Sequence, residues 1–166
     1  ELVYDVLAQL KESVPAKPVH VDAKENLPLF KLDYGLLSQV LHNLIHNALT
    51  HIPKYAVVTI KARCREDKLV LIVEDTGFGF PVDEIDRVFE KFYRLKDSAP
   101  GGTGLGLSIV KGFVEAMKGT IHLENMLKLA RLGVALGGLT AVADVFDLVL
   151  DGYGAVFGLT AFSKVP

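Results

Sequence analysis

The amino-acid sequence predicts an α+β fold in which helices cover one face of a mixed, mostly antiparallel β-sheet. Two observations predict it. Apolar residues recur at the spacing of one helix face in three separate segments. Two other segments, with alternating or wholly apolar residues, are joined by the short charged turn REDK, which is typical of a β-hairpin. The chain has 166 residues, half of them apolar, so it can bury one proper core and we expect a single domain.

In the first third of the chain, helical and extended patterns alternate. The segment ELVYDVLAQLKESV predicts a helix that Pro15 stops, and two short strands are expected at Val19–Asp22 and Leu27–Leu32. Asp33 can cap the long helical segment YGLLSQVLHNLIHNALTHI, which Pro53 then ends.

The hairpin follows this helix, with strands in YAVVTIKARC and KLVLIVEDT. The remaining pattern predicts a short helix near Asp83–Phe89, a loop, a helix after Gly104 and a strand in GTIHLEN.

Composition narrows the class of protein. A net charge of −2 supplies no basic field for nucleic acid or for a membrane surface, and the single cysteine cannot form an internal disulfide. The sequence shows no signal-peptide pattern, and the uncharged run Leu132–Ala143 is too short to span a bilayer. We expect a soluble protein of the intracellular type that binds no nucleic acid.

Four glycines occur within Gly101–Gly106, directly before a helical pattern. Ordered glycines indicate a tight turn or a close approach to the main chain, and a helix N-terminus suits an anion such as phosphate. The loop is not a Walker A motif, because no Gly-Lys-Ser/Thr follows at the required spacing, and the polar segment before it does not fit a dinucleotide fingerprint. The glycines indicate either a phosphate site or an ordinary loop.

The long helix carries Asn43 and Asn47 four residues apart, so both side chains lie on one stripe. Asparagine is a poor helix former and needs a local reason to be present. The stripe is either a solvated face or a set of amide oxygens that coordinate a hard cation such as Mg²⁺.

The segment EDTGFGF follows the apolar strand KLVLIV, which places Asp75 at the end of that strand. A turn explains Gly77 and Gly79, but it does not explain the acid. A carboxylate there can accept a hydrogen bond from an exocyclic amine, while the glycines let a flat ring lie against the main chain.

The motifs NLIHNALTH, DTGFGF, FEKFYR and GGTGLGLSIV occur in this order. The set resembles the catalytic ATP-binding domain of sensor histidine kinases, within the gyrase-like ATPase superfamily, over residues 1–125. The resemblance implies a two-layer α/β sandwich of the Bergerat type, with ATP between the long helix and a flexible lid.

The resemblance also implies roles for individual residues. Asn47 becomes the Mg²⁺ ligand, Asp75 the acceptor for the adenine amino group, and Asn43, Asn47 and Arg94 the catalytic set. Phe89 and Phe92 look like aromatic anchors beneath the lid. The implied nucleotide-binding residues are Asn43, Asn47, His51, Asp75, Gly77, Gly79, Arg94, Gly102, Thr103, Gly104, Leu105 and Gly106.

Two departures from the family pattern bear on mechanism. Thr50 and His51 stand where a lysine and a tyrosine are common, which removes one phosphate cation. Asn43 stands where the ATP-hydrolysing branches carry a water-activating glutamate, so fast hydrolysis is disfavoured and transfer to an external nucleophile is favoured. The five histidines lack the sequence context of a phosphate acceptor; they are His20, His42, His46, His51 and His122.

The implied function is to bind Mg-ATP and position the γ-phosphate for transfer to a histidine on a separate dimerisation domain, in two-component signalling with a response regulator. The chain alone is expected to label itself little. The resemblance implies a cytoplasmic module of a homodimeric sensor, which can be membrane-attached. Two alternatives are a regulatory nucleotide-binding module without transfer and a protein serine kinase of the anti-sigma-factor type.

The resemblance ends before residues 126–166, which are apolar and poor in charge. We expect this extension to belong to the single domain and to carry the closing strand. A helix is predicted near Met126–Leu136, followed by a hairpin of Thr140–Leu150 with Tyr153–Phe162 around the Asp151-Gly152 turn. The alternative is a tail with no evolved role.

Overall fold

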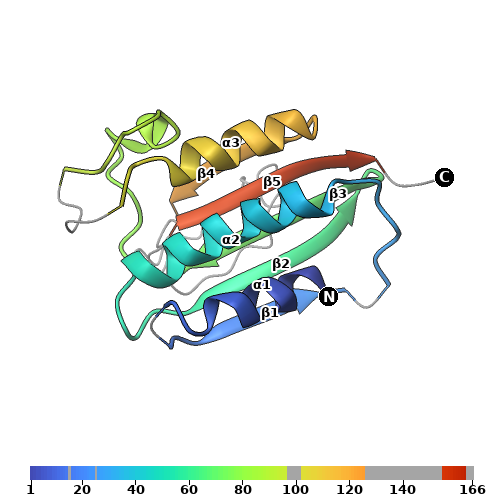
Figure 1. Cartoon of the computed structure of the whole chain (residues 1–166), viewed down its shortest axis with the longest axis horizontal. Helices are drawn as coiled ribbons and strands as arrows, with labels where there is room; N and C mark the ends of the chain where they lie inside the picture. The colour runs from blue at the N-terminus through green and yellow to red at the C-terminus, as the bar shows by residue number, and fades with distance from the viewer. Residues whose placement is uncertain (15, 25, 97–101, 126–154, 164–166) are drawn as a thin grey trace, which may run out of the picture.

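The computed structural model describes residues 1–14, 16–24, 26–96 and 102–125, and the backbone of residues 155–163. Three helices lie side by side across one face of a five-stranded sheet (Figure 1). The helices are α1 (Leu2–Leu10), α2 (Tyr34–His51) and α3 (Gly106–Ala116). The predicted α+β class and the two-layer arrangement are confirmed.

The sheet has the strand order β1-β2-β3-β5-β4. β1 pairs with β2 in parallel, and all other pairings are antiparallel, as the sequence predicts for a mixed sheet. The strands are β1 (Val19–Ala23), β2 (Val58–Arg65), β3 (Lys68–Asp75), β4 (Thr120–Asn125) and β5 (Ala155–Ser163).

β5 lies between β3 and β4 and pairs with both. It falls within the segment for which a closing strand is expected. The expected helix at Met126–Leu136 and the expected strand at Thr140–Leu150 lie outside the described residues, and a single domain over residues 1–166 stays a prediction.

The core lies between the helices and the sheet. α2 contributes the largest share of it, because its apolar residues recur every three or four positions and face β2 and β3. Alternate residues of β2 and β3, such as Ile60 and Val73, complete the layer. The fully buried side chains of α2 are Leu37, Val40, Leu41, Leu44 and Ile45.

The ends of α2 follow from two residues. Asp33 accepts a hydrogen bond from the Leu36 N–H at 2.9 Å, which confirms it as the N-cap. Pro53 lies just past the last helical residue, His51, and its missing N–H and the restriction that it places on Ile52 end the helix there.

Two predicted elements differ in the structure. The strand expected at Leu27–Leu32 is absent apart from an isolated bridge at Phe30, because Pro28 has no N–H to give to a ladder. The helix expected at Asp83–Phe89 is a single 3₁₀ turn, η1 (Ile85–Arg87), with turns on either side.

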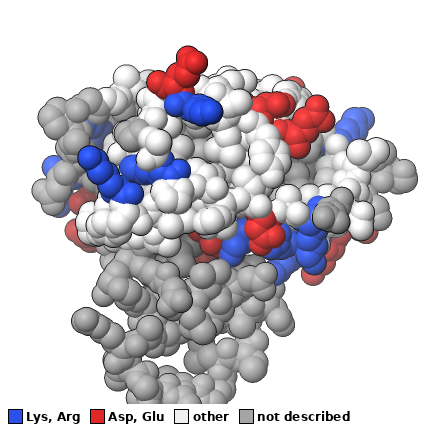
Figure 2. Space-filling view, turned by 90° about the horizontal axis from the view of Figure 1, so that it is seen from below, with Lys and Arg blue, Asp and Glu red and all other residues white. Residues whose placement is uncertain are grey.

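Two observations concern the surface. On the face shown in Figure 2, lysine and arginine side chains are interspersed with aspartate and glutamate, and the described part of this face carries no continuous basic area. Among the described helices, none combines the length and apolar character that a membrane crossing requires.

Candidate functional site

The two predicted asparagines of α2 face the first residue of α3. A Cβ atom built on Gly106 would lie 3.5 Å from Asn43 Oδ1 and 3.6 Å from Asn47 Nδ2. Asn43 also donates a hydrogen bond from Nδ2 to Gln39 O at 2.8 Å, which leaves its Oδ1 directed toward α3. Both amides are partly exposed. The structure therefore brings together the asparagine stripe and the glycine loop, which are about 60 residues apart in the sequence.

The N-terminus of α3 carries backbone N–H groups that have no partner within the helix. Its N-cap residue, Leu105, makes no side-chain cap hydrogen bond within the described part of the chain. The first N–H groups of a helix have no intrahelical partner, and they carry the positive end of its dipole. Gly102 and Gly104 have φ angles of +77° and +69°, so the loop needs glycine at both positions.

Asp75 lies at the end of β3 and is buried. Its Oδ1 accepts a hydrogen bond from the Gly77 N–H at 2.8 Å. A Cβ on Gly77 would lie 2.8 Å from Asp75 Oδ1 and 2.8 Å from Ile52 Cγ2, so only glycine fits between the carboxylate and the end of α2. The turn after β3 is thus packed directly against Ile52, the residue that follows α2.

The DTGFGF loop is fixed at its far end by Asn125. The Phe80 N–H donates to Asn125 Oδ1 at 2.7 Å, and Asn125 Nδ2 donates back to Phe80 O at 2.7 Å. Between these ends, Gly79 has a φ angle of +72°. The loop is therefore held at both ends, with its middle at Phe78, which is 79% exposed.

The FEKFYR segment is held by a polar cluster that the sequence reading did not include. Tyr93 Oη donates to the buried Glu84 carboxylate, which raises the pKa of the phenol because ionisation would lose this bond. The Arg87 guanidinium lies over the Tyr93 ring, 4.4 Å from its centroid. Arg87 also pairs with Glu90 at 3.3 Å.

The same segment meets the glycine loop through its backbone. The Phe92 N–H donates to Gly104 O at 3.0 Å, and a Cβ on Gly104 would lie 2.7 Å from Phe92 C and 2.8 Å from Tyr93 O. The expectation that the Phe92 side chain is an anchor beneath the lid is wrong, because this side chain is 72% exposed. Phe92 has a φ angle of +65°, and its main chain makes the contact with the glycine loop.

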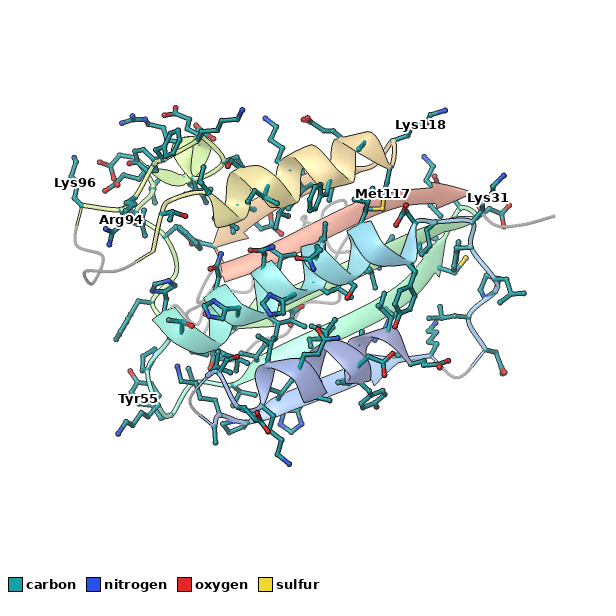
Figure 3. The ribbon with its side chains drawn as sticks, viewed as in Figure 1. Lys31, Tyr55, Arg94, Lys96, Met117 and Lys118 are labelled. Atoms are coloured by element: carbon teal, nitrogen blue, oxygen red, sulfur yellow. The ribbon has the colours of Figure 1, made fainter. Side chains whose placement is uncertain are left out.

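Positive groups gather at the end of α2. Burial lowers the pKa of His51, and the positive charges of His46, Lys17 and Arg94 lower it further, although the His51 ring keeps an exposed side. Figure 3 shows Arg94 and Lys96 on the loop that follows η1, at the end of the molecule where α2 ends and α3 begins. Arg94 is exposed, and its charge acts on His51 at the end of α2.

The predicted site residues thus gather at one end of the sandwich, where β3 and α2 end and α3 begins (Figure 1). Thr103 is exposed and Leu105 partly exposed in the same loop. Sequence reasoning missed Asn125 and Lys17. Lys17 Nζ donates to Leu49 O and to Ile52 O, which are carbonyls of the α2 end. The available signal for Lys17 is Pro53, because a proline after a helix leaves a carbonyl without its N–H donor.

A family model described as histidine kinase-, DNA gyrase B- and HSP90-like ATPase matches residues 32–143. The chain belongs to this family. It is an ATP-binding domain of the histidine-kinase type, and the resemblance stated from the sequence is confirmed. The matched range includes α2, the DTGFGF loop and α3.

Sensor kinases of bacteria are among the relatives of this histidine-kinase-type domain. It is 36% identical to the sensor histidine kinase WalK of Bacillus subtilis over 119 residues, which are 66% of this chain and 20% of that protein. It is 36% identical to the adaptive-response sensory kinase SasA of Synechococcus elongatus over 130 residues, 76% of this chain and 34% of that protein. The chain therefore spans about a third or less of the length of these relatives.

Solved structures share the fold. The mycobacterial sensor histidine kinase MprB superposes with a TM-score of 0.76 at 19% identity, over 99% of this chain and 95% of that chain. Full-length ShkA, in a complex with AMPPNP, superposes with a TM-score of 0.72 at 25% identity, over 99% of this chain and 30% of that chain. The histidine kinase ATPase fold of the domain is thus shared with solved kinases.

Proposed function

We propose that this domain binds Mg-ATP at the end of the sandwich and positions the γ-phosphate for transfer to a histidine on a separate dimerisation domain. One observation carries the proposal. Asn43 and Asn47 converge on the first residue of α3, within 3.6 Å of a Cβ built there, so amide oxygens and open helix N–H groups meet at one place. Such a pairing suits a phosphate chain with a hard cation.

The asparagine amides fit a Mg²⁺ ion bound together with phosphates. Mg²⁺ prefers oxygen ligands and is usually held by one or two protein groups, with water and phosphate oxygens completing its shell. Asn47 would supply the protein ligand, and Asn43 would lie on its phosphate side. When bound, the ion neutralises charge on the phosphates. The N–H groups of α3 and the Arg94 guanidinium would bind the remaining phosphate oxygens.

The base would be read by Asp75. Its buried carboxylate is oriented by the Gly77 N–H, and a carboxylate is an acceptor of the kind that an exocyclic amine requires. The main chain at Gly77 and Gly79 lets a flat ring approach. The complex of the related kinase ShkA with AMPPNP, an ATP analogue, supports nucleotide binding by this fold.

Transfer is favoured over hydrolysis at this site. Asn43 has no carboxylate with which to accept a proton from water, so the site holds the phosphate chain without activating a water nucleophile. Positioning and charge neutralisation suffice for phosphoryl transfer to an imidazole presented by a partner domain. In the whole protein, we propose a homodimeric sensor kinase with this domain on the cytoplasmic side and a response regulator downstream.

Calorimetry with ATP, with and without Mg²⁺, tests the binding step. We expect Mg²⁺-dependent binding that Asn47→Ala weakens by about tenfold or more, the value of one charge-assisted contact. Asn26→Ala, at an exposed asparagine outside the site, is the matched control. Equal affinity of the wild type and Asn47→Ala in the presence of Mg²⁺ would remove Asn47 as the metal ligand.

Radiolabelled ATP tests the transfer step. The chain is incubated with a histidine-bearing dimerisation domain from a related sensor kinase, and with the same domain carrying His→Gln at its acceptor. We expect acid-labile label on the first domain only, and little label on this chain when it is alone. ATP binding without label on the partner favours a regulatory module, and acid-stable label on serine indicates a serine kinase.

A further inference from the structure

Lys17 makes contacts that a solvent-facing lysine does not make. It lies between α1 and β1, and its ammonium donates to Leu49 O and, at 2.7 Å, to Ile52 O. Leu49 O would normally accept from the N–H four residues later, but that residue is Pro53 and has none. Lys17 therefore replaces a missing helix hydrogen bond, and it places a cation at the negative end of α2.

The end of α2 that Lys17 binds is packed against the DTGFGF loop, which contains Asp75 and Gly77. Ile52 supplies one of the two carbonyls, and its Cγ2 would lie 2.8 Å from a Cβ on Gly77. The Gly77 N–H in turn orients the Asp75 carboxylate at 2.8 Å. A displacement of the α2 end would therefore move the group that faces the base.

Lys17 and Asp75 also interact through their charges. Burial lowers the pKa of Lys17, and the negative charge of Asp75 opposes that shift. The attraction between the two charges adds to the packing that connects the end of α2 with the Asp75 carboxylate.

We propose that Lys17 is a positioning residue for base selection: it fixes the end of α2, and through Ile52 and Gly77 it holds the Asp75 carboxylate in place to read a 6-amino purine. This inference rests on the proposed function, in which Asp75 faces the base. Lys17 itself does not touch the nucleotide. Its contribution belongs to selectivity between purines and not to the binding of phosphate.

Inosine triphosphate is the probe that separates these contributions. It carries the same triphosphate, but it has a carbonyl where ATP has the amino group, so a fixed carboxylate rejects it. We expect the wild type to prefer ATP over ITP by about 100-fold, because a buried charged acceptor is left without its donor.

The variant Lys17→Met should weaken ATP binding about tenfold and leave ITP binding nearly unchanged, so the ATP-to-ITP affinity ratio falls about tenfold. Lys17→Arg should restore most of the ratio, because a guanidinium can donate to the same carbonyls. Lys54→Met, at an exposed lysine just past α2, removes the same charge and is the matched control. Both affinities are measured by calorimetry, with unfolding midpoints recorded for every variant.

The outcomes are separable. A wild type that binds neither nucleotide overturns the proposed function itself. A wild type that selects ATP, together with a Lys17→Met variant that keeps the same ratio or loses both nucleotides equally, overturns the role of Lys17. If Lys17→Met does not fold, Ile52→Ala tests the same connection, since loosening Ile52 against Gly77 should lower the ratio without changing any charge.

Discussion

The two ends of the proposed nucleotide site are built in different ways. At the base end, the Asp75 carboxylate is buried, is bonded to the Gly77 N–H, and is backed by the end of α2 that Lys17 holds. At the phosphate end, the side chains reach solvent. The amides of Asn43 and Asn47 are partly exposed and lie beside the N-terminus of α3, which has no side-chain cap in the described structure, and Arg94 is exposed.

This difference indicates which end of the nucleotide site is preorganised before the ligand binds. Groups fixed by core packing lose little conformational entropy on binding, so the base end is preorganised. Side chains and loop N–H groups at the surface must be ordered by the ligand, so the phosphate end depends on the phosphates and the cation. Selectivity for the base and affinity for the phosphates should then respond to different substitutions.

The largest effect is expected at the base end, from Asp75→Asn. An amide there cannot keep the Gly77 N–H and also accept from an amino group as strongly as a carboxylate, so ATP affinity should fall about 100-fold. Calorimetry measures the loss, and Asp83→Asn, at an exposed aspartate, is the control. An Asp75→Asn variant that binds ATP as tightly as the wild type would contradict this difference between the two ends, because Asp75 would then contribute nothing to ATP affinity.

A smaller loss of ATP affinity is expected from a substitution where the glycine loop contacts the FEKFYR segment. Gly104→Ala would place a methyl group 2.7 Å from Phe92 C, and backbone atoms on that side cannot move away as a flexible side chain would. Gly102→Ala has the same sign of φ but no atom within 4 Å of the new methyl group, so it isolates the backbone strain of about 1–2 kcal/mol.

We expect Gly104→Ala to weaken ATP binding several-fold more than Gly102→Ala, with little change in the ATP-to-ITP ratio for either variant. Calorimetry with both nucleotides measures this. Equal losses of ATP affinity in the two variants would mean that the contact with Phe92 is unimportant and that the glycine loop acts independently of the FEKFYR segment.

A moderate loss of stability is expected from Tyr93→Phe. The substitution leaves the buried Glu84 carboxylate without its hydroxyl donor, so the FEKFYR segment should loosen. We expect the unfolding midpoint to fall by roughly 2–4 °C. Thermal unfolding followed by circular dichroism measures it, and Tyr55→Phe, at a ring that is 76% exposed, should leave it unchanged. Equal midpoints for the two variants would contradict the role given to Glu84.

Local patterns predicted much of this fold. The 3.6-residue period predicted α2, and Asp33 and Pro53 predicted its limits to within one residue. These two residues could be used in this way because each acts on the backbone next to it. The strand expected at Leu27–Leu32 was wrong because its apolar residues were weighed without the missing N–H of Pro28.

Residues that act across the fold were harder to predict. The glycines and asparagines of the site lie in short motifs, whereas Lys17 reaches carbonyls 32 and 35 residues away, and Asn125 reaches a backbone group 45 residues away. A backbone carbonyl has the same chemistry at every position, so its partner leaves no pattern in the sequence. The exposure of the Phe92 ring was also mispredicted, because the motif FEKFYR carries no signal of the positive φ angle at this residue.

The smallest expected effect concerns His51, where the two ends of the site meet. Burial and neighbouring positive charges lower its pKa in the folded protein below the ordinary value of 6.5. The unfolded chain then binds more protons than the folded chain just below about pH 6.5, so stability rises with pH through that range and levels off above it. His51→Gln should remove a small part of this slope, because the ring keeps an exposed side.

Urea unfolding between about pH 5 and pH 7.5 measures the slope, with His122→Gln, at an exposed histidine of β4, as the matched control. Since the shift comes partly from Arg94, which the proposed function places on the phosphates, a bound triphosphate should oppose it by neutralising that cation. The difference between the His51→Gln and wild-type slopes should therefore shrink when ATP and Mg²⁺ are present. A difference that ATP leaves unchanged would place His51 outside the field of the phosphates and assign it to the base end alone.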